Sequence, residues 1–216
     1  MKAFMPTIAV LTGDLIGSTD AGYDAVERAM TLIERTAEDI ARWPGGIPAR
    51  FTRYRGDGWQ MVVAPPARAL RAAILLAARL RAAPDVPPTR IAIGLGAAGS
   101  LGSGDLSDAH GAAFESSGRA LEGLRRDMRL AVGGSGLTPI HLAVVDLLEE
   151  RLSRWTPEQA EASALALDPA DPTQAEIAAR LGISSQAVSY RLSGAGTAAI
   201  RRALQGWETA GDGDAR

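Results

Sequence analysis

Two aspartates, Asp14 and Asp57, lie where a carboxylate could do chemistry. Asp14 follows the apolar run 7–11, which is typical of a buried strand, and Asp57 is the centre of a Gly-Asp-Gly turn at 56–58. If these two strand ends are neighbours, the carboxylates repel and raise each other's pKa, and a divalent cation between them removes the repulsion. The sequence therefore predicts a shared site for Mg²⁺ or Mn²⁺.

The segment after Asp14 could hold a phosphate. A helix is expected to begin at its end, and the segment itself consists of Leu15, Ile16, Gly17, Ser18 and Thr19. Free backbone N–H groups and the helix dipole favour an anion at a helix start. Carboxylates that bind a metal, next to a turn that binds an anion, are the parts that nucleoside triphosphate chemistry requires.

Each of these motifs also has a simpler interpretation. Asp-x-x-x-Ser/Thr can be a helix N-cap, and Gly-Asp-Gly can be a hairpin turn without any other role. Taken singly, the simpler interpretation is the commoner one. The two motifs together, on strands expected to be neighbours, favour a shared site.

The hydrophobic periodicity predicts the elements that position these residues. The expected order is strand, helix, strand, strand, helix, strand, then a further helix and strand, over residues 7–13, 22–43, 49–55, 59–64, 67–83, 89–96, 111–127 and 128–132. This order is typical of an α+β fold of the ferredoxin-like or palm type, an antiparallel sheet with helices on one face.

The C-terminal part differs in character and predicts a second, all-α domain. Thr173 and Glu176 form a capping-box pattern, Gly182 can end the first helix, and Ser184 can cap a second one. Helix, tight glycine turn and helix make a helix-turn-helix. We therefore divide the chain into a palm domain (1–134), connecting helices (135–170), a helix-turn-helix domain (171–208) and a frayed tail (209–216).

Several C-terminal side chains are suited to DNA. The second helix is expected to expose Ser185, Gln186, Ser189, Tyr190 and Arg191, and Arg201 and Arg202 follow it. Gln and Arg can bind base edges, whereas Ser, Tyr and further Arg side chains can bind phosphates. The alternative is a three-helix interaction module that does not bind DNA.

The N-terminal motifs resemble those of the class III nucleotidyl cyclases. The matching segments are Asp14–Thr19, Arg55–Gly58, RIAIGLG (90–96) and DAHGAAFESSGRAL (108–121), so the resemblance covers about residues 5–132. It implies that Arg119 stabilises the triphosphate during catalysis and that Arg53 lies at the base-selecting position. Glu115 departs from the family, which has Asn there. The GAAF segment is also similar to the SatD family of small cyclase-like proteins.

The segment EIAARLGISSQAVSYRL (176–192) resembles bacterial helix-turn-helix regulators. Both resemblances imply a homodimer, because cyclase sites form between two protomers and helix-turn-helix proteins bind two half-sites. The preferred hypothesis is a DNA-binding regulator with a nucleotide- and metal-binding domain. The alternative is an active nucleotidyl cyclase or another metal-dependent phosphoryl-transfer enzyme that acts on a nucleoside triphosphate. Glu115 would face developing negative charge, which argues against efficient cyclisation.

The composition limits the remaining possibilities. The chain has 216 residues, no cysteine and a formal net charge of -2, which excludes disulfides, thiolate zinc sites and a generic polyanion binder. The start of the chain lacks a signal-peptide pattern, and the apolar segment 67–83 contains four arginines. We therefore expect a cytoplasmic protein with no membrane partner.

Overall fold

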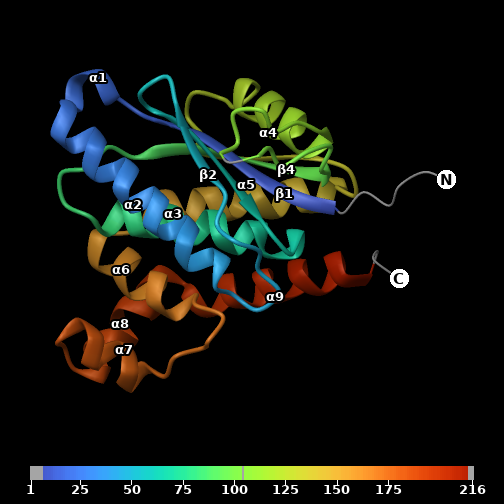
Figure 1. Ribbon diagram of the computed structural model, residues 1–216. Helices are drawn as coiled ribbons and strands as arrows, with labels where there is room; N and C mark the ends of the chain where they lie inside the picture. Colours follow the sequence, from blue (N-terminus) through green and yellow to red (C-terminus); the bar gives the residue numbers. More distant parts are fainter. Residues whose placement is uncertain (1–6, 104, 214–216) are drawn as a thin grey trace.

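A five-stranded mixed sheet forms the centre of the structure (Figure 1). The computed structural model describes residues 7–103 and 105–213. The strand order is β2-β3-β1-β4-β5, with β1 (Thr7–Leu15), β2 (Phe51–Tyr54), β3 (Gly58–Val63), β4 (Thr89–Ala97) and β5 (Leu130–Gly134). All neighbouring strands are antiparallel except β4 and β5, which are parallel. The α+β class is confirmed, but the expectation of a wholly antiparallel sheet is wrong for the last strand.

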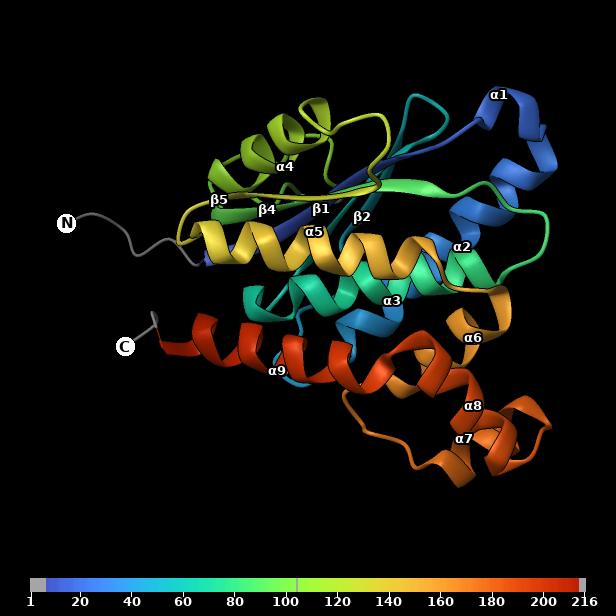
Figure 2. The same cartoon turned by 180° about the vertical axis from the view of Figure 1, so that it is seen from behind.

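Helices cover both faces of this sheet. They are α1 (Ser18–Ala21), α2 (Tyr23–Ala41), α3 (Ala69–Ala82, after the 3₁₀ turn η1, Pro66–Arg68), α4 (Ala112–Glu122), α5 (Pro139–Ser153), α6 (Pro157–Ala166), α7 (Gln174–Leu181), α8 (Ser185–Ala195) and α9 (Thr197–Gly213). Figure 2 shows α4 on the opposite side of the sheet from α3 and α5. None of the helices in the described ranges is both long enough and apolar enough to span a bilayer.

The position of α4 corrects the expectation that helices cover one face only. Successive residues of a strand point to opposite faces. On β1, Ala9 and Leu11 belong to the core beneath α2 and α3, whereas Ile8 and Val10 pack with Phe114 of α4. An uninterrupted apolar run such as 8–11 has two buried faces, and each face needs a cover.

Two boundaries near α4 also differ from the expectation. The predicted helix 111–127 ends at Glu122, where the N–H of Gly123 bonds to the Arg119 carbonyl, and the last strand begins at Leu130 instead of residue 128. This strand includes Gly133, although glycine has a low strand propensity. A Cβ at Gly133 would lie 3.2 Å from the Ser116 carbonyl oxygen, so the glycine allows α4 to approach the sheet closely.

The hydrophobic core continues from the sheet into the C-terminal helices. Trp155, Leu167, Leu204 and Trp207 are buried in the same cluster as the inner side chains of β1 and α3. A smaller cluster joins α6, α7 and α8 through Ala166, Ile177, Ala178 and Val188. The predicted helix-turn-helix helices therefore have a core of their own, whereas α9 packs into the main core and continues as helix through residues 209–213.

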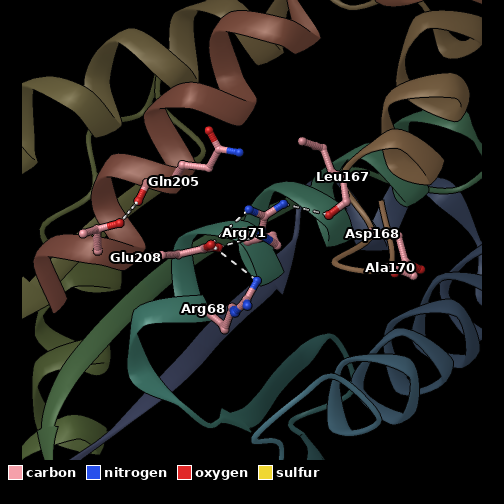
Figure 3. A network of polar contacts seen from close by, with 8 residues as sticks. Arg68, Arg71, Leu167, Asp168, Ala170, Gln205 and Glu208 are labelled. Carbon is pink, nitrogen blue, oxygen red and sulfur yellow. Dashed lines mark hydrogen bonds and ion pairs between the residues drawn. The ribbon is translucent and has the colours of Figure 1, made fainter. Parts of the chain in front are cut away.

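A buried ion pair fixes α9 to α3 (Figure 3). Arg71 donates to both carboxylate oxygens of Glu208, at 2.6 and 3.1 Å, and to the carbonyl oxygen of Leu167 at 3.0 Å. Arg68 lies 3.4 Å from the same carboxylate. One arginine thus joins three segments that are far apart in the sequence: α3, the end of α6 and α9.

Candidate functional site

The first predicted metal ligand, Asp14, is paired with an arginine. The antiparallel register of β1 and β4 places Asp14 opposite Arg90, on the same face of the sheet. The Arg90 Nε donates to Asp14 Oδ1 at 2.7 Å, and its Nη2 contacts the other carboxylate oxygen. These hydrogen bonds raise the pKa of the Arg90 guanidinium, which therefore stays charged at neutral pH.

The second predicted ligand, Asp57, lies at the same end of the sheet. Asp14 pairs with Gly58, so Asp57 is one residue beyond that level in the β2–β3 turn. The Leu15 N–H donates to the Asp57 carbonyl at 3.1 Å, and the Ser18 hydroxyl donates to Asp57 Oδ2 at 2.6 Å. The structure therefore brings the first motif and the hairpin turn together.

The charges of Asp14 and Asp57 affect the pKa of two neighbours, Tyr54 and Arg90. Burial raises the pKa of the Tyr54 hydroxyl, the charges of Asp14 and Asp57 raise it further, and Arg55 partly opposes them. The charge of Asp57 also contributes to the raised pKa of Arg90. These side chains form one electrostatic unit in which cations already compensate the two acids.

Arg90 already supplies a positive charge where a divalent cation would bind Asp14. Among the described residues, no group of three or more His, Cys, Asp or Glu side chains could hold a metal ion. Two carboxylates would have to suffice, and both oxygens of Asp14 already accept hydrogen bonds from Arg90. A metal at Asp14 would have to share this carboxylate with Arg90 or displace the guanidinium.

Replacing Arg90 with alanine should therefore raise the affinity for Mn²⁺ by about tenfold or more. The substitution frees both Asp14 oxygens and leaves two negative charges close together. Titration calorimetry with MnCl₂ alone measures the change.

Two variants separate ligand competition from simple charge. Arg55→Asn removes a positive charge near the same carboxylates without freeing an oxygen of Asp14, and should change the affinity much less; asparagine tolerates the positive φ of 51° at this position. Asp14→Asn combined with Arg90→Ala should abolish the gain. Equal gains from the Arg55 and Arg90 variants would refute competition for Asp14.

The predicted phosphate-binding turn is smaller than expected. Helix α1 is a single turn that begins after Gly17, whose φ of 70° is left-handed. The Leu15 N–H bonds to Asp57, and the Ile16 N–H bonds to the Pro88 carbonyl at 2.7 Å. These two N–H groups are not available to a ligand, which restricts the phosphate-binding prediction to residues 17–19.

The other residues predicted for nucleotide chemistry have partners of their own. Arg53 donates to Glu27 at 2.7 Å and to the Gly56 carbonyl at 2.7 Å, so it supports the hairpin. Arg119 lies 3.6 Å from Glu115 on the exposed side of α4. Among the described residues, no contact of Asp14 or Asp57 involves Arg119. The Arg119–Glu115 pair is therefore not linked to the two aspartates.

The C-terminal helices have the predicted caps and turn. Thr173 Oγ1 accepts from the Glu176 N–H, and the Glu176 carboxylate accepts from the Thr173 N–H at 2.7 Å. Gly182 has a φ of 65°, which favours glycine at this helix end. The Ser184 hydroxyl accepts from the Ala187 N–H at 3.1 Å and caps α8.

The predicted DNA-binding side chains fall into two groups. Ser185, Gln186, Ser189 and Tyr190 are exposed along α8, and Arg202 is exposed on α9. Arg191 instead pairs with Glu161 of α6 at 2.8 Å, and Arg201 pairs with Asp171. A phosphate would have to displace these acids from the two paired arginines.

Sequence reasoning missed Arg90 and Tyr54 as neighbours of the aspartates. Both lie in strands, where they looked like ordinary β residues. The available signal was the register: an antiparallel β1–β4 pair that aligns the two apolar runs also places Arg90 opposite Asp14.

No protein-family model matches the chain, and the comparison with curated proteins found no match. The resemblances to class III cyclases, to the SatD family and to helix-turn-helix regulators therefore rest on the motifs alone. They remain predictions.

Proposed function

We propose that the chain is a DNA-binding regulator whose helix α8 enters the major groove. The observation that carries this proposal is the exposed polar face of α8, formed by Ser185, Gln186, Ser189 and Tyr190. Tyr190 is 71% exposed, so its hydroxyl is accessible to a phosphate or a base edge. Gln186 lies in the first turn of α8, where helices of this kind contact base edges.

The surroundings of α8 support a recognition role. Helices α6, α7 and α8 have a small core of their own and lie at the end of the molecule away from the sheet (Figures 1 and 2). The segment 173–207 contains four arginines and one acidic residue, whereas the whole chain has a net charge of -2. Arg180 and Arg202 are exposed, whereas Arg191 and Arg201 would have to leave Glu161 and Asp171 before they could bind a phosphate backbone.

For the sheet domain we propose a palm-type fold that binds a nucleotide. The order β2-β3-β1-β4 and the intervening helices α2 and α3 match the ferredoxin-like arrangement. Residues 17–19 would contact phosphate, and Mg²⁺ or Mn²⁺ would compete with Arg90 for Asp14. We also propose a homodimer, because two copies of α8 would meet two half-sites.

The alternative is a nucleotidyl cyclase or related phosphoryl-transfer enzyme. The meeting of Asp14, Asp57 and Ser18 at one end of the sheet favours it. Arg119 argues against it within one chain, because this residue faces Glu115 and is not joined to the aspartates. Incubation with each nucleoside triphosphate and Mn²⁺ distinguishes the two functions. Rapid formation of a cyclic product would favour the enzyme over the DNA-binding regulator.

DNA binding is tested by selecting duplexes from a random pool and measuring their affinity by mobility shift. Gln186→Ala should weaken binding to the selected duplex by about 1–3 kcal/mol, because it removes a base contact. Its affinity for random DNA should stay almost unchanged. Arg202→Ala should weaken binding to all sequences alike and flatten the salt dependence, because it removes a phosphate contact.

A matched control keeps this test specific. Gln205→Ala removes an exposed glutamine from α9 and should leave both affinities unchanged. If the intact protein binds no duplex even at low salt, the three-helix unit is an interaction module instead.

A further inference from the structure

A cavity lies at the junction between the sheet and the C-terminal helix. Its volume is about 260 Å³. The apolar side chains in its wall are Pro66, Ala67, Leu95, Leu137, Trp207 and Ala210. They come from η1, from β4 and the segment after β5, and from α9. A molecule in this cavity would therefore touch the sheet domain and α9 at once.

The same two elements are held together by the ion pairs of Glu208. Arg68 ends η1, Arg71 is in the first turn of α3, and both contact Glu208, which follows the cavity residue Trp207 directly (Figure 3). The chain reaches α9 from α8 through the single turn at Gly196. Occupancy of the cavity would act on the contact that positions α9, and through α9 on α8.

His141 adds a polar ring to this largely apolar wall. Its Nδ1 accepts the Thr138 N–H at 3.1 Å and lies 2.8 Å from the Thr138 hydroxyl. Because a backbone N–H can only donate, Nδ1 acts as the acceptor and the ring hydrogen lies on Nε2. The ring stands edge-on to Trp207, with centroids 4.9 Å apart and an interplanar angle of 87°. Residue His141 thus offers an N–H donor beside an aromatic surface.

The charges of the wall define the ligand further. The described residues that line the cavity include no Asp, Glu, Lys or Arg, and its polar side chains are those of Thr7, Ser135 and His141. An ionised ligand group would lose its hydration there without a counter-charge. An uncharged molecule keeps the apolar contact and needs one acceptor for the His141 donor.

We propose that this cavity is an effector site for a small, flat, uncharged molecule that has one carbonyl-type acceptor. The ring of the ligand packs on Trp207 and Pro66, and its oxygen accepts from His141 Nε2. Bound there, the ligand stabilises the docked position of α9 and changes the affinity of α8 for DNA. The regulatory part rests on the proposed DNA-binding function, whereas the binding site does not.

The probe for this site is 6-propionyl-2-dimethylaminonaphthalene, an uncharged aromatic ketone whose emission shifts to the blue when it leaves water. The full chain should bind it with a blue shift and with a raised unfolding temperature, because the probe binds the folded state. Ala210→Trp should weaken binding by about tenfold or more, since the indole fills the cavity from an exposed position on α9. His141→Phe keeps an aromatic ring but no donor, and should weaken binding by about fivefold.

A matched variant and a DNA measurement complete the test. Ala198→Trp places the same side chain at an exposed position of α9 outside the cavity and should leave probe binding unchanged. The site is refuted if the full chain does not bind the probe, or if the Ala198 and Ala210 variants bind it equally. With the site established, the probe should change the mobility-shift affinity of the full chain but not that of the Ala210 variant. An unchanged affinity refutes regulation. Absence of DNA binding together with intact probe binding refutes the proposed function and leaves the site standing.

Discussion

Replacing Arg71 with alanine should lower the free energy of unfolding by about 3–5 kcal/mol, the loss typical of breaking a buried ion pair from one side. Arg71 is 6% exposed, and it donates to both oxygens of Glu208 and to the Leu167 carbonyl. Without it, the largely desolvated Glu208 carboxylate keeps Arg68 as its one ionic partner among the described residues, and the Leu167 carbonyl loses a donor. Urea unfolding followed by tryptophan fluorescence measures the loss, because Trp155 and Trp207 lie in the core that α9 shares.

Two further variants distinguish the effect of burial from the effect of losing a charge. Arg154→Ala breaks the ion pair between Arg154 and Glu150, two side chains that are mostly exposed. It should lower the free energy of unfolding by less than about 1 kcal/mol. The double replacement Arg71→Met with Glu208→Leu removes both charges and should recover most of the stability. If Arg71→Ala costs no more than Arg154→Ala, the buried pair does not hold α9 in place.

Local sequence patterns were sufficient for most elements of the fold. The hairpin was predictable because aromatic and β-branched residues flank the Gly56–Gly58 turn, and Gly56 adopts a positive φ of 87°. The caps of α7 and α8 were predictable for the same reason, since Thr173, Glu176 and Ser184 act on residues three positions away.

Features that depend on distant contacts could not be predicted in this way. The close packing of α4 on the sheet depends on glycines in β4 and β5, which local propensity treats as weak strand formers. The partner of Asp14 required the register of β1 with β4. The pairing of Arg191 with Glu161 required the packing of α6 against α8.

The candidate site shows the same division. Asp14, Asp57 and Ser18 were expected to meet because a palm-like strand order makes their strand ends neighbours. The pattern of carboxylates could not indicate that a guanidinium already neutralises one of them. A cation requirement can be met by a side chain as well as by a metal, and the sequence motif alone does not distinguish the two.

The approach of α4 to β4 at Gly94 predicts the second large effect. Gly94→Ala should lower the free energy of unfolding by about 2–4 kcal/mol, because it inserts a methyl group where no space exists. A Cβ at Gly94 would lie 2.1 Å from the Ala113 carbonyl oxygen and 2.4 Å from the Ser117 nitrogen. Both are backbone atoms of α4, so the helix must move away from β4, and the 2.7 Å hydrogen bond between Thr12 and Ser117 is lost with it.

The neighbouring helix supplies the control for this substitution. Gly118 lies within α4, and a Cβ there would meet nothing within 4 Å. Gly118→Ala should therefore raise stability by up to about 1 kcal/mol through helix propensity alone. Urea unfolding should give opposite signs for the two alanines, because only the methyl group at position 94 enters the contact between α4 and the sheet. A loss at Gly94 no larger than about 1 kcal/mol would mean that α4 does not pack against β4 as closely as the structure describes.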